Sequence, residues 1–326
     1  MNPCQPVRLG IIGLGRMGQN HLRVLSLLKG AEIGFVYDKD SDTTQRIAQT
    51  AGVLAADDWS VLLGEVDAVI IASPTTTHAD YIFAAADGVR NIFVEKPVAE
   101  SSDRALEVAA FAADRDLNIQ VGFVERFNPA VQQLKQLLDH SREVVSVDFA
   151  RTNKISARIT DVDVVADLMI HDIDLALHLN GPVSDIAAHG IADGGMIDFA
   201  SVLLTHRNGR FSRLIASRIT DKKMRMIQAT CRDMFVDCDL LRKEISITRQ
   251  SEVVQPAGEP YIITALEETL EVRPHEALVL ELQAFLNSCN GEILDHTPGV
   301  EAGVEAMRIC TVVQGSIVEK PEFSPA

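Results

Sequence analysis

The sequence predicts two domains: an α/β domain with a doubly wound parallel sheet, then an α+β domain with a large, mostly antiparallel, open-faced sheet. Up to about residue 125, short apolar runs alternate with amphipathic helical stretches, which is the pattern of βαβ units with right-handed crossovers. Beyond that point, strand-like runs follow one another with Gly and Asp turns between them, which favours antiparallel pairing. The 326 residues suffice for two separate cores, so we expect domains at 1–125 and 126–326.

The elements follow in chain order. In the first domain we expect strands at VRLGII (7–12), EIGFVY (32–37), DAVIIAS (67–73), NIFVEK (91–96) and NIQVGF (118–123), each followed by a helical pattern. The second domain begins with the strand VVSVDFA (144–150) and a helix from Val164 that ends near Asn180. Strand-like runs then occupy 186–192, 199–206, 210–219, 225–231, 234–240 and 244–249. Two helical segments, near 267–289 and 298–316, complete the prediction.

Composition and charge exclude several classes of protein. The net charge of −16 argues against nucleic acid as the main partner, although a local cluster of Arg and Lys can still hold a small anion. No apolar run is long enough to cross a bilayer and the N-terminus lacks the apolar core of a signal peptide, so we expect a cytoplasmic protein. The five Cys residues include no CxxC pair, which indicates reduced thiols and no metal site.

Gly13, Gly15 and Gly18 form a G-x-G-x-x-G motif directly after the first predicted strand and at the start of a helix. In this context the glycines allow a tight turn, leave room for a pyrophosphate against the backbone, and let the helix pack on the strand. The helix N-terminus then offers free N–H groups and a partial positive charge to the phosphates. The motif therefore predicts a Rossmann fold that binds a dinucleotide, with Arg16 and Met17 in the same binding turn.

Asp38 ends the second predicted strand, twenty-five residues after Gly13, where a carboxylate can accept hydrogen bonds from the adenosine ribose. A 2′-phosphate at that point would meet a fixed negative charge, and a charge pair at about 4 Å costs about 4 kcal/mol at an effective dielectric of roughly 20. We therefore expect NAD as the cofactor rather than NADP. Lys39, also a candidate for cofactor contact, would partly offset this repulsion, and a turn or capping role for Asp38 stays open.

Two further motifs follow predicted strands, at the edge where a doubly wound sheet places its ligands. The first is ASPTTTHADY (72–81), and the second is FVEKPVAE (93–100). Pro cannot continue a strand ladder, and an X-Pro bond in the cis form would fix the direction of the preceding Lys96. A surface turn with a solvated lysine is the alternative interpretation. These motifs add candidates for cofactor contact, which are Ser73, Thr75, His78, Glu95 and Lys96.

Four polar residues of the helix expected from residue 164 recur at intervals of four, three and four: Asp167, His171, Asp174 and His178. In a regular α-helix they fall within about 60° of one another on one face. Spacing alone favours the solvent-exposed face of an ordinary amphipathic helix over a catalytic group.

Five motifs stand in a fixed order along the chain: GIIGLGRMG (10–18), SPTTTH (73–78), EKP (95–97), VGFVERFNP (121–129) and DLMIHDIDL (167–175). In this order the chain resembles the glucose–fructose oxidoreductase / inositol dehydrogenase / rhizopine catabolism (Gfo/Idh/MocA) family, over essentially its whole length. The resemblance implies an N-terminal Rossmann domain, a C-terminal domain on an open sheet, and a nicotinamide oxidoreductase that acts on sugars or cyclitols. The fourth motif contains Arg126 and Asn128, candidates for cofactor and substrate contact respectively. Thr76 is a departure, since the family often has Asn there.

The resemblance also implies catalytic roles. Lys96 matches the lysine of the family's EKP motif, beside the nicotinamide and the substrate hydroxyl, and Asp167 and His171 match its Asp-x-x-x-His pair. A histidine suits proton transfer because its ordinary pKa is about 6.5. His171 is thus the expected base, Asp167 its partner, and Lys96 the group that orients and polarises the substrate oxygen, although an exchange of roles between His171 and Lys96 stays open. Asp174 is expected to support the site or the fold, and His178 to lie at a surface or interface.

Three cations, Arg151, Lys154 and Arg158, lie within eight residues of an otherwise acidic chain, just before this helix. Arginine binds phosphate or carboxylate oxygens bidentately, which favours an anionic substrate, and a solvated loop or strand edge is the alternative. The chain looks most similar to the nucleotide-sugar branch of the family, which includes the UDP-N-acetylglucosamine 3-dehydrogenases. That resemblance implies oxidation of UDP-N-acetylglucosamine to its 3-keto derivative, toward the 2,3-diamino sugars of lipid A. The candidates for substrate contact are therefore Lys96, Asn128, Lys154, Arg158, Asp167 and His171.

Two other functions stay open. One is a myo-inositol or free-sugar dehydrogenase, in which the three cations contact only solvent or cofactor. The other is a non-catalytic NAD-binding sensor, which the presence of Lys96, Asp167 and His171 disfavours. A homo-oligomer, dimer or tetramer, is expected because one broad face of the second sheet would otherwise be exposed.

Overall fold

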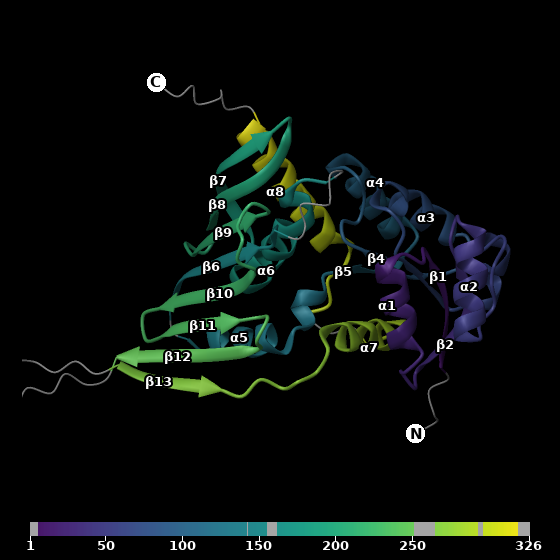
Figure 1. Cartoon of the computed structure of the whole chain (residues 1–326), viewed down its shortest axis with the longest axis horizontal. Helices are drawn as coiled ribbons and strands as arrows, with labels where there is room; N and C mark the ends of the chain where they lie inside the picture. The colour runs from purple at the N-terminus through teal and green to yellow at the C-terminus, as the bar shows by residue number, and fades with distance from the viewer. Residues whose placement is uncertain (1–5, 142, 155–161, 251–264, 293–295, 319–326) are drawn as a thin grey trace, which may run out of the picture. The chain divides into compact units, whose positions relative to one another are not determined.

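The computed structural model describes residues 6–141, 143–154, 162–250, 265–292 and 296–318. The chain divides into two compact units. Figure 1 labels the helices and strands of both. Unit 1 comprises residues 1–127 and 276–308, and unit 2 comprises residues 128–275 and 309–326. Neither unit is one continuous segment of the chain.

Unit 1 is built on five parallel strands in the order β2-β1-β3-β4-β5. The strands are β1 (Val7–Ile12), β2 (Ala31–Tyr37), β3 (Ala68–Ile71), β4 (Asn91–Glu95) and β5 (Asn118–Gly122). Because β2 and β3 pair with opposite sides of β1, the sheet is doubly wound. Its ligand site is therefore expected beyond the carboxyl ends of β1 and β3. This order confirms the Rossmann fold that the sequence predicts.

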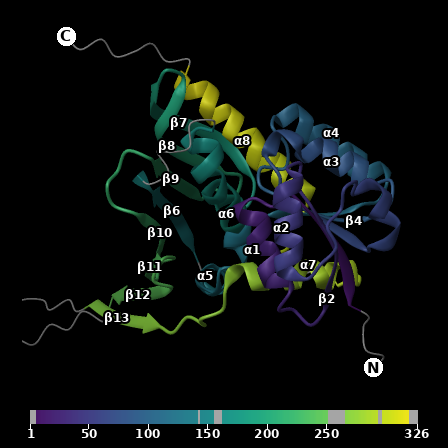
Figure 2. The ribbon, with the colours of Figure 1, turned by 45° about the vertical axis from the view of Figure 1, so that its right-hand side comes forward.

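Helices and short turns connect these strands. They are α1 (Arg16–Leu25), α2 (Ser41–Ala51), α3 (His78–Ala85) and α4 (Ser102–Asp114), with the 3₁₀ turns η1 (Ser60–Glu65), η2 (Thr75–Thr77) and η3 (Val124–Phe127). α3 and α4 pack against each other, as Figure 2 shows from a second direction. Leu22 and Leu25 of α1 share a core with Leu9 and Ile11 of β1, so burial of this apolar face fixes α1 on the sheet.

α7 (Ala277–Cys289) completes the core of unit 1, although it lies far along the chain. Leu278, Leu282, Phe285 and Leu286 are at most 7% exposed and belong to the same cluster of buried residues as β1 and α1. Their spacing of four, three and one residues is that of one helix face. The sequence predicts a single domain boundary near residue 125. The structure differs in that it returns residues 276–308 to unit 1, because the apolar face of α7 finds its packing partners there.

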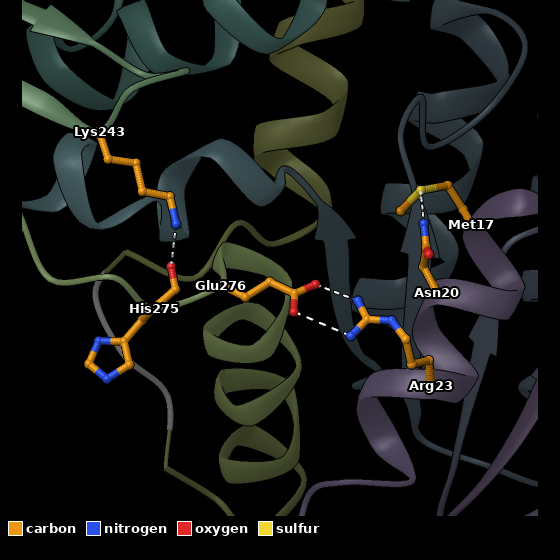
Figure 3. Close-up of polar contacts among 6 residues, drawn as sticks. All are labelled: Met17, Asn20, Arg23, Lys243, His275 and Glu276. Atoms are coloured by element: carbon orange, nitrogen blue, oxygen red, sulfur yellow. Dashed lines mark hydrogen bonds and ion pairs between the residues drawn. The ribbon is translucent and has the colours of Figure 1, made fainter.

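Side-chain contacts hold the chain at His275 and Glu276, where it passes from unit 2 back to unit 1 (Figure 3). In unit 2, Lys243 Nζ donates to the carbonyl oxygen of His275 at 2.9 Å. In unit 1, Nη1 and Nη2 of Arg23 donate to the two carboxylate oxygens of Glu276 at 3.3 and 2.5 Å. The second contact is a half-exposed ion pair on α1, so it contributes geometry more than free energy.

Unit 2 is built on an eight-stranded sheet in the order β13-β12-β11-β10-β6-β9-β8-β7. Every neighbouring pair is antiparallel except β6 and β9, which confirms the predicted mostly antiparallel sheet. The strands are β6 (Val144–Thr152), β7 (Val183–Asp193), β8 (Met196–His206), β9 (Phe211–Ser217), β10 (Met224–Cys231), β11 (Phe235–Asp239), β12 (Glu244–Gln250) and β13 (Ala265–Leu270).

Helices pack on this sheet. α5 (Pro129–His140) contacts β11 and β12, and α6 (Ile170–Asn180) contacts β6 and β9. α8 (Val300–Val318) begins in unit 1 and ends in unit 2, where a side chain at Gly190 of β7 would collide with Ile317. Along β8 and β9, buried side chains alternate with partly or fully exposed ones, as in a sheet with one face open to solvent. Among the described residues, no helix is both long and apolar enough to cross a membrane.

The prediction of a helix over 267–289 is wrong at its start. Residues 265–270 form β13, which pairs with β12 at the edge of the sheet. Pro274 lies between this strand and α7, and a proline disfavours helical backbone in the residue before it. The helix therefore begins only at Ala277.

The helix predicted from residue 164 is present but is not regular. Residues Val165–Met169 form a π-helical segment, called η5, that continues into α6. The wider π turn changes the angle between residues on either side of it, so positions calculated for a regular helix do not hold across Met169. Asp174 is 1% exposed and His178 is half-buried, so neither lies on a fully exposed helix face.

Candidate active site

The glycine loop between β1 and α1 has the shape of a phosphate site. A Cβ atom on Gly13, where φ is +93°, would lie 2.5 Å from the backbone nitrogen of Ser73, and one on Gly18 would lie 1.8 Å from the Gly13 carbonyl oxygen. Neither position has room for a side chain. Gly15 faces open space and is the N-cap of α1, with no side chain hydrogen-bonded to the helix end. The free N–H groups of α1 therefore point into an open region that fits a pyrophosphate.

A cavity of about 520 Å³ lies beside this loop, within unit 1. Its position beyond the ends of β1, β3 and β4 is the ligand site of a doubly wound sheet. Most of the residues expected to bind the cofactor line it: Gly13, Gly15, Met17, Asp38, Lys39, Ser73, Thr75, His78, Glu95 and Lys96. Thr76 lines it as well.

Three of the predicted cofactor contacts are placed differently. Gly18 is buried inside α1, where it serves helix–strand packing. Arg16 is exposed at the first position of α1, and Arg126 is 8% exposed in η3. Asn20 Nδ2 donates to the sulfur of Met17 at 3.7 Å, an exposed contact within α1 (Figure 3).

Asp38 is tied to the glycine loop by its own carboxylate. Oδ2 accepts a hydrogen bond from the Leu14 amide at 2.7 Å, and Oδ1 accepts one from the Asp40 amide at 3.0 Å. The negative charge at the end of β2 is therefore fixed in place. Tyr81 lies at the same cavity, and burial, with Tyr37 and Asp38 adding to it, raises the pKa of the Tyr81 phenol.

The loop after β3 is held by its own hydroxyl groups and by a buried histidine. Ser73 Oγ and Thr77 Oγ1 lie 2.8 Å apart, and Thr77 Oγ1 also donates to the Pro74 carbonyl at 2.8 Å. His78 is 1% exposed, and its ring nitrogens lie 2.7 Å from the Pro97 carbonyl oxygen and 2.9 Å from that of Ser73. Burial lowers the pKa of His78, while these two carbonyls and the Glu95 and Glu100 carboxylates oppose that effect.

The EKP motif lies where β4 ends. Glu95 is the last residue of the strand, Lys96 lines the cavity, and the Lys96–Pro97 peptide bond is cis. Glu95 Oε1 lies 2.7 Å from Nε2 of His21, a fully buried residue of α1. His21 was not predicted, because nothing in the sequence of a helix that faces the sheet marks one histidine as the partner of a carboxylate 74 residues away.

Unit 2 carries the predicted Asp-x-x-x-His pair. Asp167 lies in the π-helical segment η5, and His171 lies at the start of α6, half-buried. Asp167 Oδ2 accepts a hydrogen bond at 3.3 Å from Nη2 of Arg218, which is 2% exposed. π-helical segments are frequent at functional sites, which agrees with a functional role for Asp167. Arg218, 51 residues away in sequence, was not predicted.

The three predicted cations do not form one cluster. Arg151 is buried, and its Nε and Nη2 atoms donate to both carboxylate oxygens of Asp172 at 2.7 to 3.0 Å. It is therefore part of the interior of unit 2, and not a solvated cation as its sequence position suggests. Lys154 is exposed and pairs with Asp221. Arg158 lies outside the described residues.

Asn128 is the N-cap of α5, where its Oδ1 accepts a hydrogen bond from the Ala130 amide at 3.1 Å. At 7% exposure it is a buried cap, so its side-chain oxygen already has a structural role. Among the described residues, no group of three or more His, Cys, Asp or Glu side chains is arranged to hold a metal ion.

Comparison with known proteins agrees with this geometry. Residues 7–123 match the family model described as "Oxidoreductase family, NAD-binding Rossmann fold", and residues 136–233 match the GFO/IDH/MocA C-terminal domain. The chain is similar to UDP-N-acetylglucosamine 3-dehydrogenase of Acidithiobacillus ferrooxidans, with 29% identity over 306 residues, 93% of this chain and 94% of that protein. It is also similar to scyllo-inositol 2-dehydrogenase (NAD(+)) of Bacillus subtilis, with 28% identity over 92% of this chain and 93% of that protein.

A solved structure of the Acidithiobacillus ferrooxidans enzyme has a TM-score of 0.85 at 27% identity and covers 96% of this chain and 98% of its own. An Agrobacterium radiobacter oxidoreductase in complex with NAD+, L-tartaric acid and magnesium has the same fold, with a TM-score of 0.81 at 19% identity, covering 97% of each chain. The glycine loop and the cavity beside it fit NAD, as the family model implies. The chain thus belongs to the GFO/IDH/MocA family and is an NAD-dependent oxidoreductase.

Proposed function

We propose that this oxidoreductase oxidises a secondary hydroxyl of a nucleotide-linked sugar, and that the substrate is UDP-N-acetylglucosamine, oxidised to its 3-keto derivative for 2,3-diamino sugars of lipid A. The observation that carries the proposal is the similarity to the Acidithiobacillus ferrooxidans dehydrogenase, which extends over 93% of the chain in sequence and 96% in structure. Both units are therefore compared with one enzyme, and not the NAD-binding unit alone.

The proposed chemistry assigns a task to each catalytic candidate. NAD held by the glycine loop and the adjoining cavity would supply the acceptor for the hydride of the carbon that carries the hydroxyl group. His171 takes the hydroxyl proton, because imidazole titrates near the working pH. Asp167 stabilises the imidazolium that forms, and its carboxylate is held in turn by the buried Arg218. Lys96, in the NAD cavity, polarises the substrate oxygen. The opposite assignment, with Lys96 as the base, differs in one outcome: His171→Asn would then keep most of the turnover.

A second candidate substrate is myo-inositol or a free sugar. It is favoured by the similarity to scyllo-inositol 2-dehydrogenase of Bacillus subtilis and by the burial of Arg151, which removes one of the three cations from the argument for an anionic substrate. Lys154 and Arg158 remain the candidates for anion contact. If the substrate is a UDP-sugar, Arg158→Ala should raise KM with little change in kcat, and if it is inositol, the substitution should leave KM unchanged.

The test is the absorbance of reduced nicotinamide after purified protein is mixed with NAD and UDP-N-acetylglucosamine. Parallel reactions contain myo-inositol, free N-acetylglucosamine and the corresponding UDP-uronic acid. Each reaction is repeated with a ketone trap, because a 3-keto sugar can form in an uphill equilibrium. A signal with the UDP-amino sugar alone supports the proposal. A signal with inositol refutes the substrate, and tight NAD binding with no signal from any sugar supports the sensor alternative.

The outer face of the unit 2 sheet supports a proposal about assembly. A cavity of about 490 Å³ lies on β6 to β10, and its lining includes Leu203 and Ile215, each 40% exposed. Two large aliphatic side chains beside one another on a free sheet face favour burial against another protein surface. We propose that this face joins copies of the chain in a dimer or tetramer. Leu203→Asp should lower the mass measured by analytical ultracentrifugation, and an unchanged mass would refute this interface. A cytoplasmic location stays a prediction from the sequence.

A further inference from the structure

The two residues that flank Lys96 are each held by a different buried histidine of unit 1. Before it, Glu95 Oε1 accepts a hydrogen bond from His21 Nε2 at 2.7 Å. After it, the Pro97 carbonyl oxygen lies 2.7 Å from His78 Nδ1. His21 is 0% exposed and His78 is 1% exposed, so both rings are shielded from water.

The first contact leaves the Glu95 side chain little freedom. Glu95 of β4 pairs with Gly122 of β5, and a Cβ atom on that glycine would lie 2.9 Å from Glu95 Oε2. The carboxylate thus occupies the space that a side chain at residue 122 would need. The His21 ring in turn packs edge-to-face against the ring of Phe93, with ring centroids 5.1 Å apart. His21 Nδ1 has no hydrogen-bond partner among the described residues, so Nε2 carries the donated proton.

The second contact joins two loops at the cavity. His78 Nε2 lies 2.9 Å from the Ser73 carbonyl oxygen, so one imidazole connects the loop after β3 to the EKP motif after β4. Both partners of the ring are carbonyl oxygens, and a neutral imidazole has one N–H, so the ring donates to one of the two carbonyls at a time. An alkyl side chain at residue 78 would remove this donor from both loops. The histidine is therefore matched to this junction and is not a general core residue.

We propose that His21 and His78 are positioning residues that bracket Lys96 and fix where its backbone enters the NAD cavity. The proposal rests on the catalytic role proposed for Lys96. A lysine side chain has four rotatable bonds, so its amine can be aimed only if its backbone is rigid. A displacement of about 1 Å in such a group lowers turnover about 10²-fold. Neither histidine needs to touch the substrate or NAD for this effect.

The experiment compares His21→Gln and His78→Gln with His206→Gln. His206 is a matched control: it is 1% exposed, both its ring nitrogens are hydrogen-bonded (to Gly181 O at 2.7 Å and Ser212 Oγ at 2.8 Å), and it belongs to unit 2. Three quantities are measured: the rate at which trace acetic anhydride acetylates Lys96 relative to Lys135 of α5, the Kd of NAD by calorimetry, and kcat. Acetylation is measured by mass spectrometry on protein without NAD or substrate.

For both bracket variants we expect faster relative acetylation of Lys96, because its amine reaches solvent more often, and a decrease in kcat of about 10²-fold. The Kd of NAD should change much less than kcat, since the glycine loop is intact. His206→Gln should change none of the three. If His21→Gln does not fold, Glu95→Gln tests the same pair from its other partner. Where both variants fold, adding His21→Gln to Glu95→Gln should have no further effect.

If folded His21→Gln and His78→Gln acetylate Lys96 at the same relative rate as the wild-type protein, the positioning role of the two histidines is refuted, whatever the activity. Faster acetylation in both variants, together with no turnover of any sugar by the wild-type protein, supports the bracket and refutes the proposed function. Faster acetylation in His206→Gln as well would show a general loss of rigidity and would also overturn the proposal.

Discussion

Breaking the Arg151–Asp172 pair should lower the stability of unit 2 by the amount typical of a buried ion pair, which is larger than the amount typical of a surface pair. The two side chains are 4% and 5% exposed, and three N–O distances are 3.0 Å or less. Removing one partner of such a pair leaves a buried charge and costs about 3–5 kcal/mol, whereas an exposed pair contributes about 0–1 kcal/mol. Because each 1.36 kcal/mol is tenfold in an equilibrium constant, Arg151→Met should raise the opening equilibrium of β6 and α6 about 10²- to 10⁴-fold.

The assay is hydrogen exchange measured by mass spectrometry, because it reports on single elements of a protein with two units. Peptides from β6 and α6 should lose two or more decades of protection in Arg151→Met. Lys154→Met is the control: its pair with Asp221 is 55% and 82% exposed, so it should lose less than one decade. The double variant Arg151→Met/Asp172→Leu should regain most of the protection, because no buried charge remains.

One result would refute this reasoning. If Arg151→Met leaves the exchange of β6 and α6 unchanged and instead raises KM for the substrate, Arg151 binds substrate and is not a structural residue. The cationic stretch before α6 would then regain the role that its sequence suggests.

Three other predictions follow from burial and charge. Phe285→Ala, in the core that α7 shares with β1, should lower the free energy of unfolding by about 3–5 kcal/mol. The denaturation midpoint followed by fluorescence of Trp59, the sole tryptophan and a residue of unit 1, should fall, and a midpoint equal to wild type would contradict the assignment of α7 to this core. Asp38→Asn removes the charge fixed at the end of β2, so the ratio of kcat/KM for NADP to that for NAD should rise by up to about 10³-fold, and an unchanged ratio would mean that Asp38 does not face the ribose. Burial lowers the pKa of His206 below its ordinary 6.5, so the unfolded chain binds the proton more tightly; the stability from this residue is present above pH 6.5 and is lost as the pH falls through the lower folded value, and thermal melts should show that His206→Gln flattens this dependence.

Local signals in the sequence were sufficient for most of the fold. The runs that became β1, β4 and β5 are short, apolar and bounded by Gly, Pro or polar residues, so period and length alone identify them. Residues 265–270 were assigned to a helix because ALEETL lacks the apolar run of a buried strand and fits the helical pattern that follows it. Its pairing with β12 makes it a strand. The π-helical segment η5 was not predicted, since no single residue type in VADLM marks a π turn.

The candidate site divides in the same way. Motifs that are contiguous in sequence, such as the glycine loop and EKP, were found with their positions. The partners that orient them come from distant elements: His21 for Glu95 and Arg218 for Asp167. A single buried ion pair also changed the interpretation of Arg151, because the sequence shows the charge of a residue but not whether a neighbouring helix supplies its counter-charge.

Because the two units alternate along the chain, the core of unit 1 can be completed only after most of unit 2 has been synthesised. The ribosome completes β1 to β5 first, but the apolar face of β1 and α1 is closed by α7, whose core residues follow all eight strands of unit 2. The NAD-binding unit therefore leaves the ribosome with an exposed apolar surface and keeps it while residues 128–275 are translated. α8 completes both units at once, since its first half belongs to one and its second half to the other. Final closure of both cores thus depends on α7 and α8, and chaperone binding should persist until these two helices have emerged.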